Sequence, residues 1–322
     1  MLQPRISLCT FSCHQHWQAL QKGVAGTKFH DAVSFFDYAF SLGAEGVQTA
    51  VHGQEQARAM RAKVDGGGYY EGDIGLPKTD ADLASFNNDV QYVSDAGGKV
   101  ARAVLTGIRR YEGFKSLAEF KEFRARGLKT LQVIEQVLSK HRLRLALENH
   151  KDQTVAELVE LLRQVSSEWI GVCVDTGNNI ALLEEPHAVV EALAPFAASV
   201  HLKDMAVQPY ADGFLLSEVP LCTGFLDMPR IIATLRKANP GIGFNLEMGT
   251  RDPLRVPCLT QGYWIPFAER PAVELAKALA QVRDHPARQP PPSVSGKPVA
   301  QVLAEEEENN RISLAWMKTH IV

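Results

Sequence analysis

Apolar and polar positions follow two different periods along this chain of 322 residues. Short apolar or alternating runs predict eight β-strands, at residues 6–12, 46–52, 71–77, 100–107, 143–149, 170–175, 198–204 and 243–248. Between them, helical spacing predicts helices near residues 29–40, 83–93, 116–141, 154–166, 186–194, 226–238 and 270–284, the third of which is one helix or two broken at Gly127. This alternation is typical of a parallel sheet, and eight strands are the number that closes a barrel. We therefore predict an α/β protein with a (β/α)₈ TIM-barrel fold and a C-terminal extension.

The extension begins where the helical and strand pattern stops. Residues 289–293 read Gln-Pro-Pro-Pro-Ser, which predicts an extended linker, and residues 298–318 read as a charged helix. We predict a catalytic barrel over residues 1–284 and a proline-rich linker with a helical arm over residues 285–322. The arm is expected to pack on the barrel or on a second subunit of a homo-oligomer, and the alternative is a mobile tail.

Four of the predicted strands share one further pattern. In 143–149, 170–175, 198–204 and 243–248, large apolar residues occupy one face and small residues the other, and the small-residue face ends with Glu148, Asp175, His201 and Glu247. The carboxyl ends of barrel strands meet at one mouth, so these four side chains should converge there. Three converging carboxylates call for a compensating cation. Oxygen donors with one imidazole favour Mn²⁺, Mg²⁺ or Co²⁺, and Zn²⁺ is possible. Ordinary salt bridges at the barrel rim are the alternative.

These strand ends also resemble a known family. The segments Leu-Glu-Asn-His at 147–150, Val-Asp-Thr-Gly-Asn at 174–178, His-Leu-Lys-Asp at 201–204 and Leu-Glu at 246–247 are similar to the xylose isomerase-like superfamily of TIM barrels. The resemblance covers roughly residues 5–284. It implies that Glu148, Asp175, His201 and Glu247 bind one divalent metal, and that the two glutamates also serve as acid and base. One position differs, because Asn178 stands where the epimerases of this group usually carry a histidine. That difference leaves the reaction type open.

Further candidate residues lie at or just beyond predicted strand ends. Lys203 follows His201 on the same strand face and is a candidate catalytic residue. Candidate substrate-binding residues are Trp17, His52, Arg109, His150, Asn178 and Arg251. Each also has a structural explanation, as a rim salt bridge, a solvated loop charge or packing beneath a loop.

The function that best fits this set is a metal-dependent isomerase or epimerase of a small sugar or keto-sugar, working by proton abstraction next to a carbonyl. A metal-dependent lyase or dehydratase acting on an oxidised sugar or keto-glycoside is the alternative. From a different class, a sugar-binding barrel without turnover stays open.

Composition restricts the partners. The formal net charge of −3 argues against a nucleic-acid or anionic-membrane surface. No apolar run is long enough to predict a membrane span. The five cysteines are odd in number and without repeated spacing, which fits reduced thiols in the cytoplasm.

Overall fold

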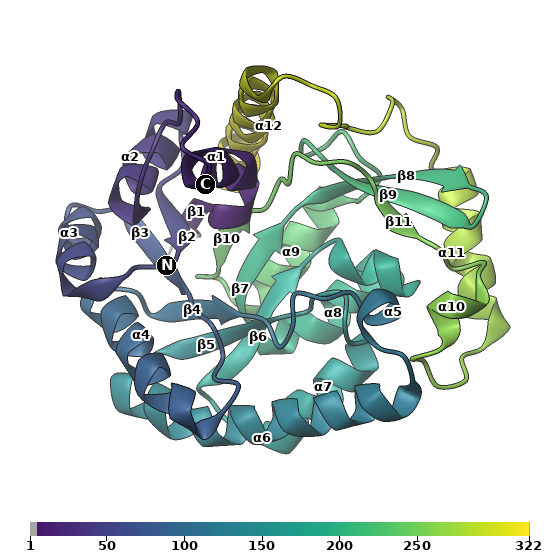
Figure 1. The fold of residues 1–322 in the computed structure, drawn as a ribbon, viewed down its shortest axis with the longest axis horizontal. Helices are drawn as coiled ribbons and strands as arrows, with labels where there is room; N and C mark the ends of the chain where they lie inside the picture. Colours follow the sequence, from purple (N-terminus) through teal and green to yellow (C-terminus); the bar gives the residue numbers. More distant parts are fainter. Residues whose placement is uncertain (1–4, 322) are drawn as a thin grey trace.

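The computed structural model of the protein describes residues 5–321, in which eight parallel strands close into a barrel (Figure 1). Around the ring the order is β1, β2, β3, β4, β5, β6, β7 and β10. These strands are Arg5–Cys9, Gly46–Thr49, Tyr69–Asp73, Val100–Ala103, Arg144–Glu148, Ile170–Asp175, Ala197–Leu202 and Gly243–Leu246. The predicted TIM barrel is therefore confirmed.

The strand bounds differ from the prediction mainly at the carboxyl ends. β1 ends at Cys9 because Thr10–Cys13 turns into the short 3-10 helix η1. β3 begins two residues before its predicted start and ends at Asp73, so the segment up to Pro77 is a loop. The start of β3 depends on a close approach to β2, because a Cβ on Gly46 would lie 1.7 Å from the carbonyl oxygen of Tyr69. Glycine is the residue that permits this contact.

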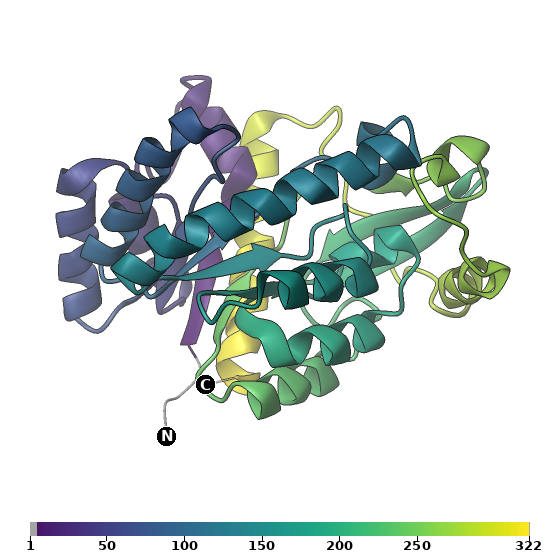
Figure 2. The same ribbon diagram turned by 90° about the horizontal axis from the view of Figure 1, so that it is seen from below.

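Helices cover the outside of the barrel (Figures 1 and 2). All seven predicted helices exist, as α2 Ala32–Leu42, α4 Leu83–Asp95, α6 Leu117–His141, α7 Val155–Val165, α8 Pro186–Leu193, α9 Met228–Ala238 and α11 Ala272–Asp284. α6 is a single helix that runs through Gly127. Two further helices were not predicted, α1 (His14–Gln21) and α3 (Gly53–Asp65). The short elements are α5 Arg110–Gly113, α10 Gln261–Trp264, η2 Asp80–Asp82, η3 Asn178–Leu182 and η4 Ala194–Phe196.

A small antiparallel sheet, which was not predicted from the sequence, stands beside the barrel mouth (Figure 1). It consists of β8 (Asp204–Tyr210), β9 (Gly213–Val219) and β11 (Leu254–Val256), in the order β11-β9-β8. β8 and β9 form a hairpin that follows directly on β7. The hairpin thereby carries residues of β9 back toward the carboxyl ends of the barrel strands.

The C-terminal helix α12 (Val299–His320) lies against β1 and β10, the two strands that close the ring. It also contacts α1 and α2, so segments from opposite ends of the sequence lie side by side (Figure 1). Leu314 and Met317 of α12 belong to the same buried core as the barrel strands. Whether residues 285–322 act as a separate arm, or join two subunits, stays a prediction.

Buried polar contacts fix α12 to the N-terminal segment. The carboxylate of Glu306 is fully buried and accepts hydrogen bonds from the backbone N–H groups of Gln15 (2.8 Å) and His16 (3.0 Å). It also lies 2.7 Å from the His16 ring nitrogen Nδ1. Asn310 donates to the carbonyl oxygen of Ser12 at 2.7 Å. The first turn of α1 is thus held by a helix about 290 residues later.

No helix between residues 5 and 321 combines the length and the apolar character that a membrane span requires. All five cysteines are free thiols, and Cys222 is the exposed one.

Candidate metal and active site

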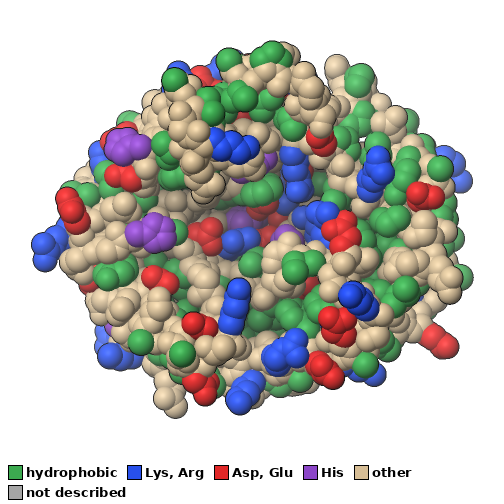
Figure 3. Space-filling model, viewed as in Figure 1, with side chains coloured by type: hydrophobic (Ala, Val, Ile, Leu, Met, Phe, Trp, Pro, Cys, Tyr) green, Lys and Arg blue, Asp and Glu red, His purple; other side chains and the backbone are tan. Residues whose placement is uncertain are grey.

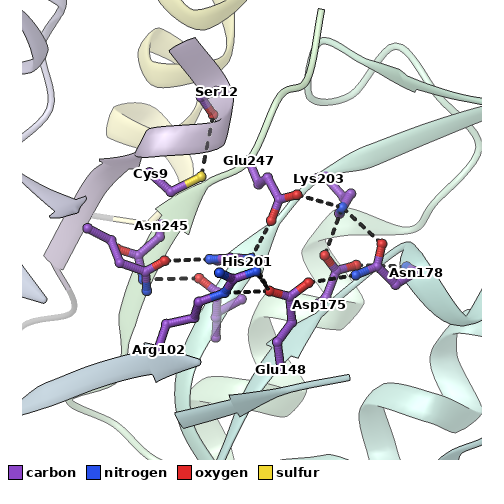
Figure 4. Close-up of polar contacts among 12 residues, drawn as sticks. Cys9, Ser12, Arg102, Glu148, Asp175, Asn178, His201, Lys203, Asn245 and Glu247 are labelled. Carbon is purple, nitrogen blue, oxygen red and sulfur yellow. Dashed lines mark hydrogen bonds and ion pairs between the residues drawn. The ribbon is translucent and has the colours of Figure 1, made fainter. Parts of the chain in front are cut away.

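Four side chains converge at the carboxyl ends of neighbouring strands (Figure 4). Glu148 ends β5, Asp175 ends β6, His201 lies on β7 and Glu247 follows β10. One potential ligand atom from each lies within 4.8 Å of those of the other three, and all four residues are buried. The structure therefore brings together the four residues that the sequence predicted as metal ligands.

The imidazole of His201 has one nitrogen held and one turned toward the carboxylates. Its Nε2–H donates to Oε1 of Gln48 at 2.5 Å, and its Nδ1 lies 3.4 Å from Glu148 Oε2 and in contact with Glu247 Oε2. The amide nitrogen of Gln48 donates to Glu71 Oε2 at 2.8 Å, which fixes the amide with its oxygen toward His201. Because Nε2–H is held by Gln48, Nδ1 is the nitrogen that faces the carboxylates: it pairs with them when it is protonated, and it offers its lone pair once that proton is lost. A metal-ligating histidine commonly has its other ring nitrogen held in this way.

Glu71 lies in the barrel interior below the four converging residues. Its carboxylate accepts from Ser199 Oγ at 2.5 Å, from Asn245 Nδ2 at 2.9 Å and from the hydroxyl of Tyr69. Burial raises the pKa of Glu71, and these donors oppose the shift. Because donors surround it, Glu71 acts only as an acceptor, and so it orients the Gln48 amide.

Two side-chain cations lie against the converging carboxylates. Arg102 of β4 contacts Glu148 Oε2 through Nε (2.7 Å) and Nη2 (2.5 Å). Lys203 Nζ lies 2.7 Å from Asp175 Oδ2 and 3.1 Å from Glu247 Oε1. Burial would raise the pKa of Glu148, but the charges of Arg102 and His201 hold it well below its usual value. Charge compensation, which the sequence assigned to a metal, is thus supplied in part by the protein itself.

The donor atoms nevertheless fit a metal ion. Asp175 Oδ2, His201 Nδ1 and Glu247 Oε2 are buried and form no well-aligned hydrogen bond within residues 5–321; their contacts are ion pairs, of Asp175 Oδ2 with Lys203 and of the other two atoms with each other. Buried polar atoms rarely stay without hydrogen bonds, and ligation satisfies such atoms directly. Oxygen donors with one imidazole suit Mn²⁺ or Mg²⁺. Cys9 Sγ lies near His201 and Glu247, but burial raises its pKa to about 11, so it is a thiol at neutral pH.

A cavity of about 360 Å³ opens above this cluster. Acidic, basic and histidine side chains gather in the hollow at the centre of the face shown in Figure 3. Glu148, His201 and Glu247 contribute to its lining. Of the predicted substrate-binding residues, the cavity wall contains Trp17, Arg109, His150 and Arg251.

These four wall residues differ in how firmly they are held. Trp17 packs on Phe29, with ring centroids 4.7 Å apart, and its Nε1 has no hydrogen-bond partner within residues 5–321. Arg251 donates two hydrogen bonds to the carboxylate of Glu218 on β9, from Nε at 2.9 Å and from Nη2 at 2.5 Å. Arg109 pairs with Glu112 at 2.5 Å. Burial, followed by the charge of Lys151, lowers the pKa of His150 to about 3, so its imidazole is neutral at pH 7.

Three predicted site residues lie elsewhere. Lys203 and Asn178 are buried behind the wall, and Asn178 Nδ2 donates to Glu148 Oε1 at 2.8 Å while its Oδ1 lies 3.2 Å from Lys203 Nζ. Asn178 thus orients a glutamate from behind. His52 does not join the site, because it is exposed and immediately precedes α3.

Sequence reasoning missed Gln48, Arg102, Lys151 and Glu218. Gln48 follows Val47 on β2, and Arg102 lies between Ala101 and Ala103 on β4, so the alternation that identified Glu148 also placed them on the inner face. Lys151 comes three residues after Glu148 and was not weighed. Glu218 belongs to the unpredicted hairpin.

Comparisons with known proteins agree with this architecture. The 3-oxo-isoapionate decarboxylase of Pectobacterium atrosepticum is 30% identical over 121 residues, which are 37% of this chain and 44% of that enzyme. The chain therefore matches less than half of the length of this curated relative. Among solved structures, an L-ribulose 3-epimerase is 13% identical over 99% of this chain and 95% of its own, with a TM-score of 0.61. A protein from Mycobacterium smegmatis, solved in complex with magnesium, is 16% identical over 87% of this chain and 100% of its own, with a TM-score of 0.56.

A family model settles the classification. The model described as xylose isomerase-like TIM barrel matches residues 36–282, which include β2 to β10 and all four converging residues. The chain belongs to the xylose isomerase-like TIM barrel family.

Proposed function

We propose that this protein is a divalent-metal-dependent isomerase or epimerase of a small keto-sugar, which moves a proton at a carbon next to a carbonyl. The observation that carries the proposal is the convergence of Glu148, Asp175, His201 and Glu247 beside the cavity, with one potential ligand atom from each within 4.8 Å of the others. The magnesium complex of the solved relative supports Mg²⁺ or Mn²⁺ as the ion. When bound, the ion would supply a Lewis acid for the substrate carbonyl.

The protein's own groups would move the proton. Glu247 reaches the cavity, and Lys203 holds its carboxylate in the ionised form in which it accepts a proton. Glu148 is the second carboxylate at the cavity, and it is held on one oxygen by Arg102 and on the other by Asn178. A proton taken by one glutamate and returned by the other, at the opposite face or at the neighbouring carbon, gives epimerisation or isomerisation.

The cavity wall supports a sugar as the substrate. Its volume of about 360 Å³ lies in the range of small-molecule sites. Trp17 offers an aromatic surface and an N–H that has no hydrogen-bond partner within residues 5–321, and Gln18, Gln21 and Arg109 offer hydrogen-bond donors for hydroxyl groups.

A lyase is the second candidate, and two observations favour it. The relative that is 30% identical over 121 residues is a decarboxylase. In addition, the two glutamates are not equivalent, because both oxygens of Glu148 already accept hydrogen bonds from cationic or amide donors. Loss of CO₂ from a carbon next to a carbonyl leaves an enolate that needs one proton donor, whereas epimerisation needs two groups on opposite faces.

Proton NMR in D₂O tests the proposal. The chelated protein and the protein resupplied with Mg²⁺ or Mn²⁺ are incubated with ketoses, 3-keto-glycosides and keto-sugar acids. We expect deuterium to enter next to the carbonyl only with metal present, and we expect Glu148→Gln and Glu247→Gln to lose the exchange. The exposed Glu308→Gln variant is the control.

The products separate the two candidates. Recovered isomers identify an isomerase or epimerase, and released CO₂, water or aglycone identifies a lyase. Metal bound with full affinity but no exchange or product in any incubation would contradict both and favour a sugar-binding barrel.

A further inference from the structure

Lys151 is a buried cation in the cavity wall without an anionic partner among the residues that the structure describes. It follows the end of β5 by three residues and is 5% exposed. Its ammonium group donates to Asn178 Oδ1, and no carboxylate among residues 5–321 forms an ion pair with it. Burying a charge without a counter-charge is costly, so such a lysine in a binding cavity calls for explanation.

The nearby carboxylates are already engaged by other cations. Asp175 forms an ion pair with Lys203 at 2.7 Å, and Glu218 forms one with Arg251 at 2.5 Å. Burial, followed by the like charges of Lys203 and Arg251, lowers the pKa of Lys151 to about 8. Lys151 is therefore still largely protonated at pH 7, and its positive charge is available to a ligand in the cavity.

The pairing of the other cations around the cavity points the same way. Arg102, Arg109, Lys203 and Arg251 each lie against a carboxylate, and Lys151 forms no ion pair within residues 5–321. A ligand with a single negative charge would supply the counter-charge that Lys151 lacks.

We propose that Lys151 binds a carboxylate group of the substrate, so that the natural substrate is a sugar acid and not a neutral sugar. The inference rests on the proposed function in taking a metal-bound sugar site as given. A carboxylate fits better than a phosphate monoester, because the latter carries close to two negative charges at pH 7. The neighbouring His150, whose Nδ1 has no hydrogen-bond partner within residues 5–321, offers a second polar contact in the same wall.

Calorimetric titration of the Mg²⁺-loaded and metal-free protein at pH 7 tests the inference. The probes are aldonates of four to six carbons, the alditols of matching configuration and the corresponding alditol phosphates. The variants are Lys151→Met, which keeps the length of the side chain without its charge, and Lys151→Arg, which keeps the charge. Lys99→Met removes an exposed lysine as the control.

We expect the wild-type protein and Lys99→Met to bind at least one aldonate about tenfold or more tightly than its alditol. Lys151→Met should lose this preference and bind the alditol within about twofold of wild type, and Lys151→Arg should retain part of the preference. The melting temperature of Lys151→Met should not fall below that of the wild type, because this substitution removes an unpaired buried charge. A wild-type protein that prefers no aldonate, a preference that survives in Lys151→Met, or tighter binding of the phosphates would overturn the inference.

This outcome is separable from the fate of the proposed function. A Lys151-dependent preference for aldonates without any deuterium exchange would refute the reaction and leave the subsite standing. If the protein instead catalyses deuterium exchange on neutral keto-sugars, and Lys151→Met leaves that exchange unchanged, the reaction would stand and the carboxylate subsite would be refuted.

Discussion

The buried contact between Glu306 and the start of α1 allows a stability prediction with a worked magnitude. The Glu306→Ala variant removes a fully buried carboxylate that accepts from two backbone N–H groups and lies 2.7 Å from the ring nitrogen of His16. The two N–H groups belong to the first turn of α1, where no helical carbonyl is available to them. Each buried donor left without a partner costs about 1–3 kcal/mol.

The three donors together set the expected size of the effect. If all three donors were left without partners, the summed cost would be at most roughly 9 kcal/mol, but water entering the space left by the side chain would satisfy some of these donors. Breaking a buried ionic contact from one side typically costs about 3–5 kcal/mol. We therefore expect Glu306→Ala to lower the free energy of unfolding by about 3–5 kcal/mol. Glu306→Gln keeps one acceptor oxygen and should lose about 1–2 kcal/mol.

Urea unfolding followed by circular dichroism and tryptophan fluorescence measures this difference. Glu308→Ala is the matched control, since Glu308 is exposed on the same helix and pairs with Arg311 at the surface. Exposed pairs of this kind contribute below about 1 kcal/mol. If Glu306→Ala were no less stable than Glu308→Ala, the contact between α1 and α12 would not secure the fold, and our reasoning would be refuted.

Three further predictions concern the metal site and the pH dependence of stability. Asp175→Ala should hold less than about a tenth of the wild-type metal after dialysis, by mass spectrometry; full metal content would exclude the four-residue site. Gln48→Met removes the acceptor for His201 Nε2 and should weaken Mn²⁺ binding about 10–100-fold, by electron paramagnetic resonance; unchanged affinity would mean that the His201 tautomer does not depend on this contact. Burial raises the pKa of Glu184 from 4.5 to about 7, so the folded state holds this proton more tightly than the unfolded chain. The stability that this proton contributes is complete below about pH 4.5 and is lost as the pH rises through 7. Because the side chain is only partly shielded from solvent, we expect Glu184→Gln to reduce the change in the free energy of unfolding between pH 4 and 8 by about 1–3 kcal/mol. If denaturation experiments showed the same pH dependence of the free energy of unfolding in Glu184→Gln as in the wild type, this prediction would be contradicted.

The parts of the fold that local pattern determines were predictable from the sequence. Alternation within one strand decides which residues face the barrel interior, and this placed Glu148, Asp175, His201 and Glu247 together. One local signal was overlooked. Ala211 and Asp212, followed by Gly213, separate two alternating segments; such a short connection with aspartate and glycine is typical of a hairpin, and β8 and β9 form one there.

Other features depend on contacts that no local pattern encodes. The unpaired state of Lys151 follows from the pairing of Glu218 with Arg251, which are 33 residues apart. Helix α3 was missed because Ala57 and Met60 are its buried residues, which is too narrow an apolar stripe to give a helical period. The role of Glu306 needs α12 to return to the first helix, which spacing alone does not predict.

The position of α12 has a consequence for how the protein is made. The helix lies against β1 and β10, so the seam of the ring is covered by residues 299–320, synthesised more than 50 residues after β10 ends. Until they emerge from the ribosome, β1 and α1 have apolar and hydrogen-bonding surface with no partner. Pairing of such distant segments makes folding slow and leaves intermediates open to aggregation. Ribosome-bound chains that stop before residue 299 should therefore bind chaperones and be cleaved readily by protease, and completion of α12 should end both.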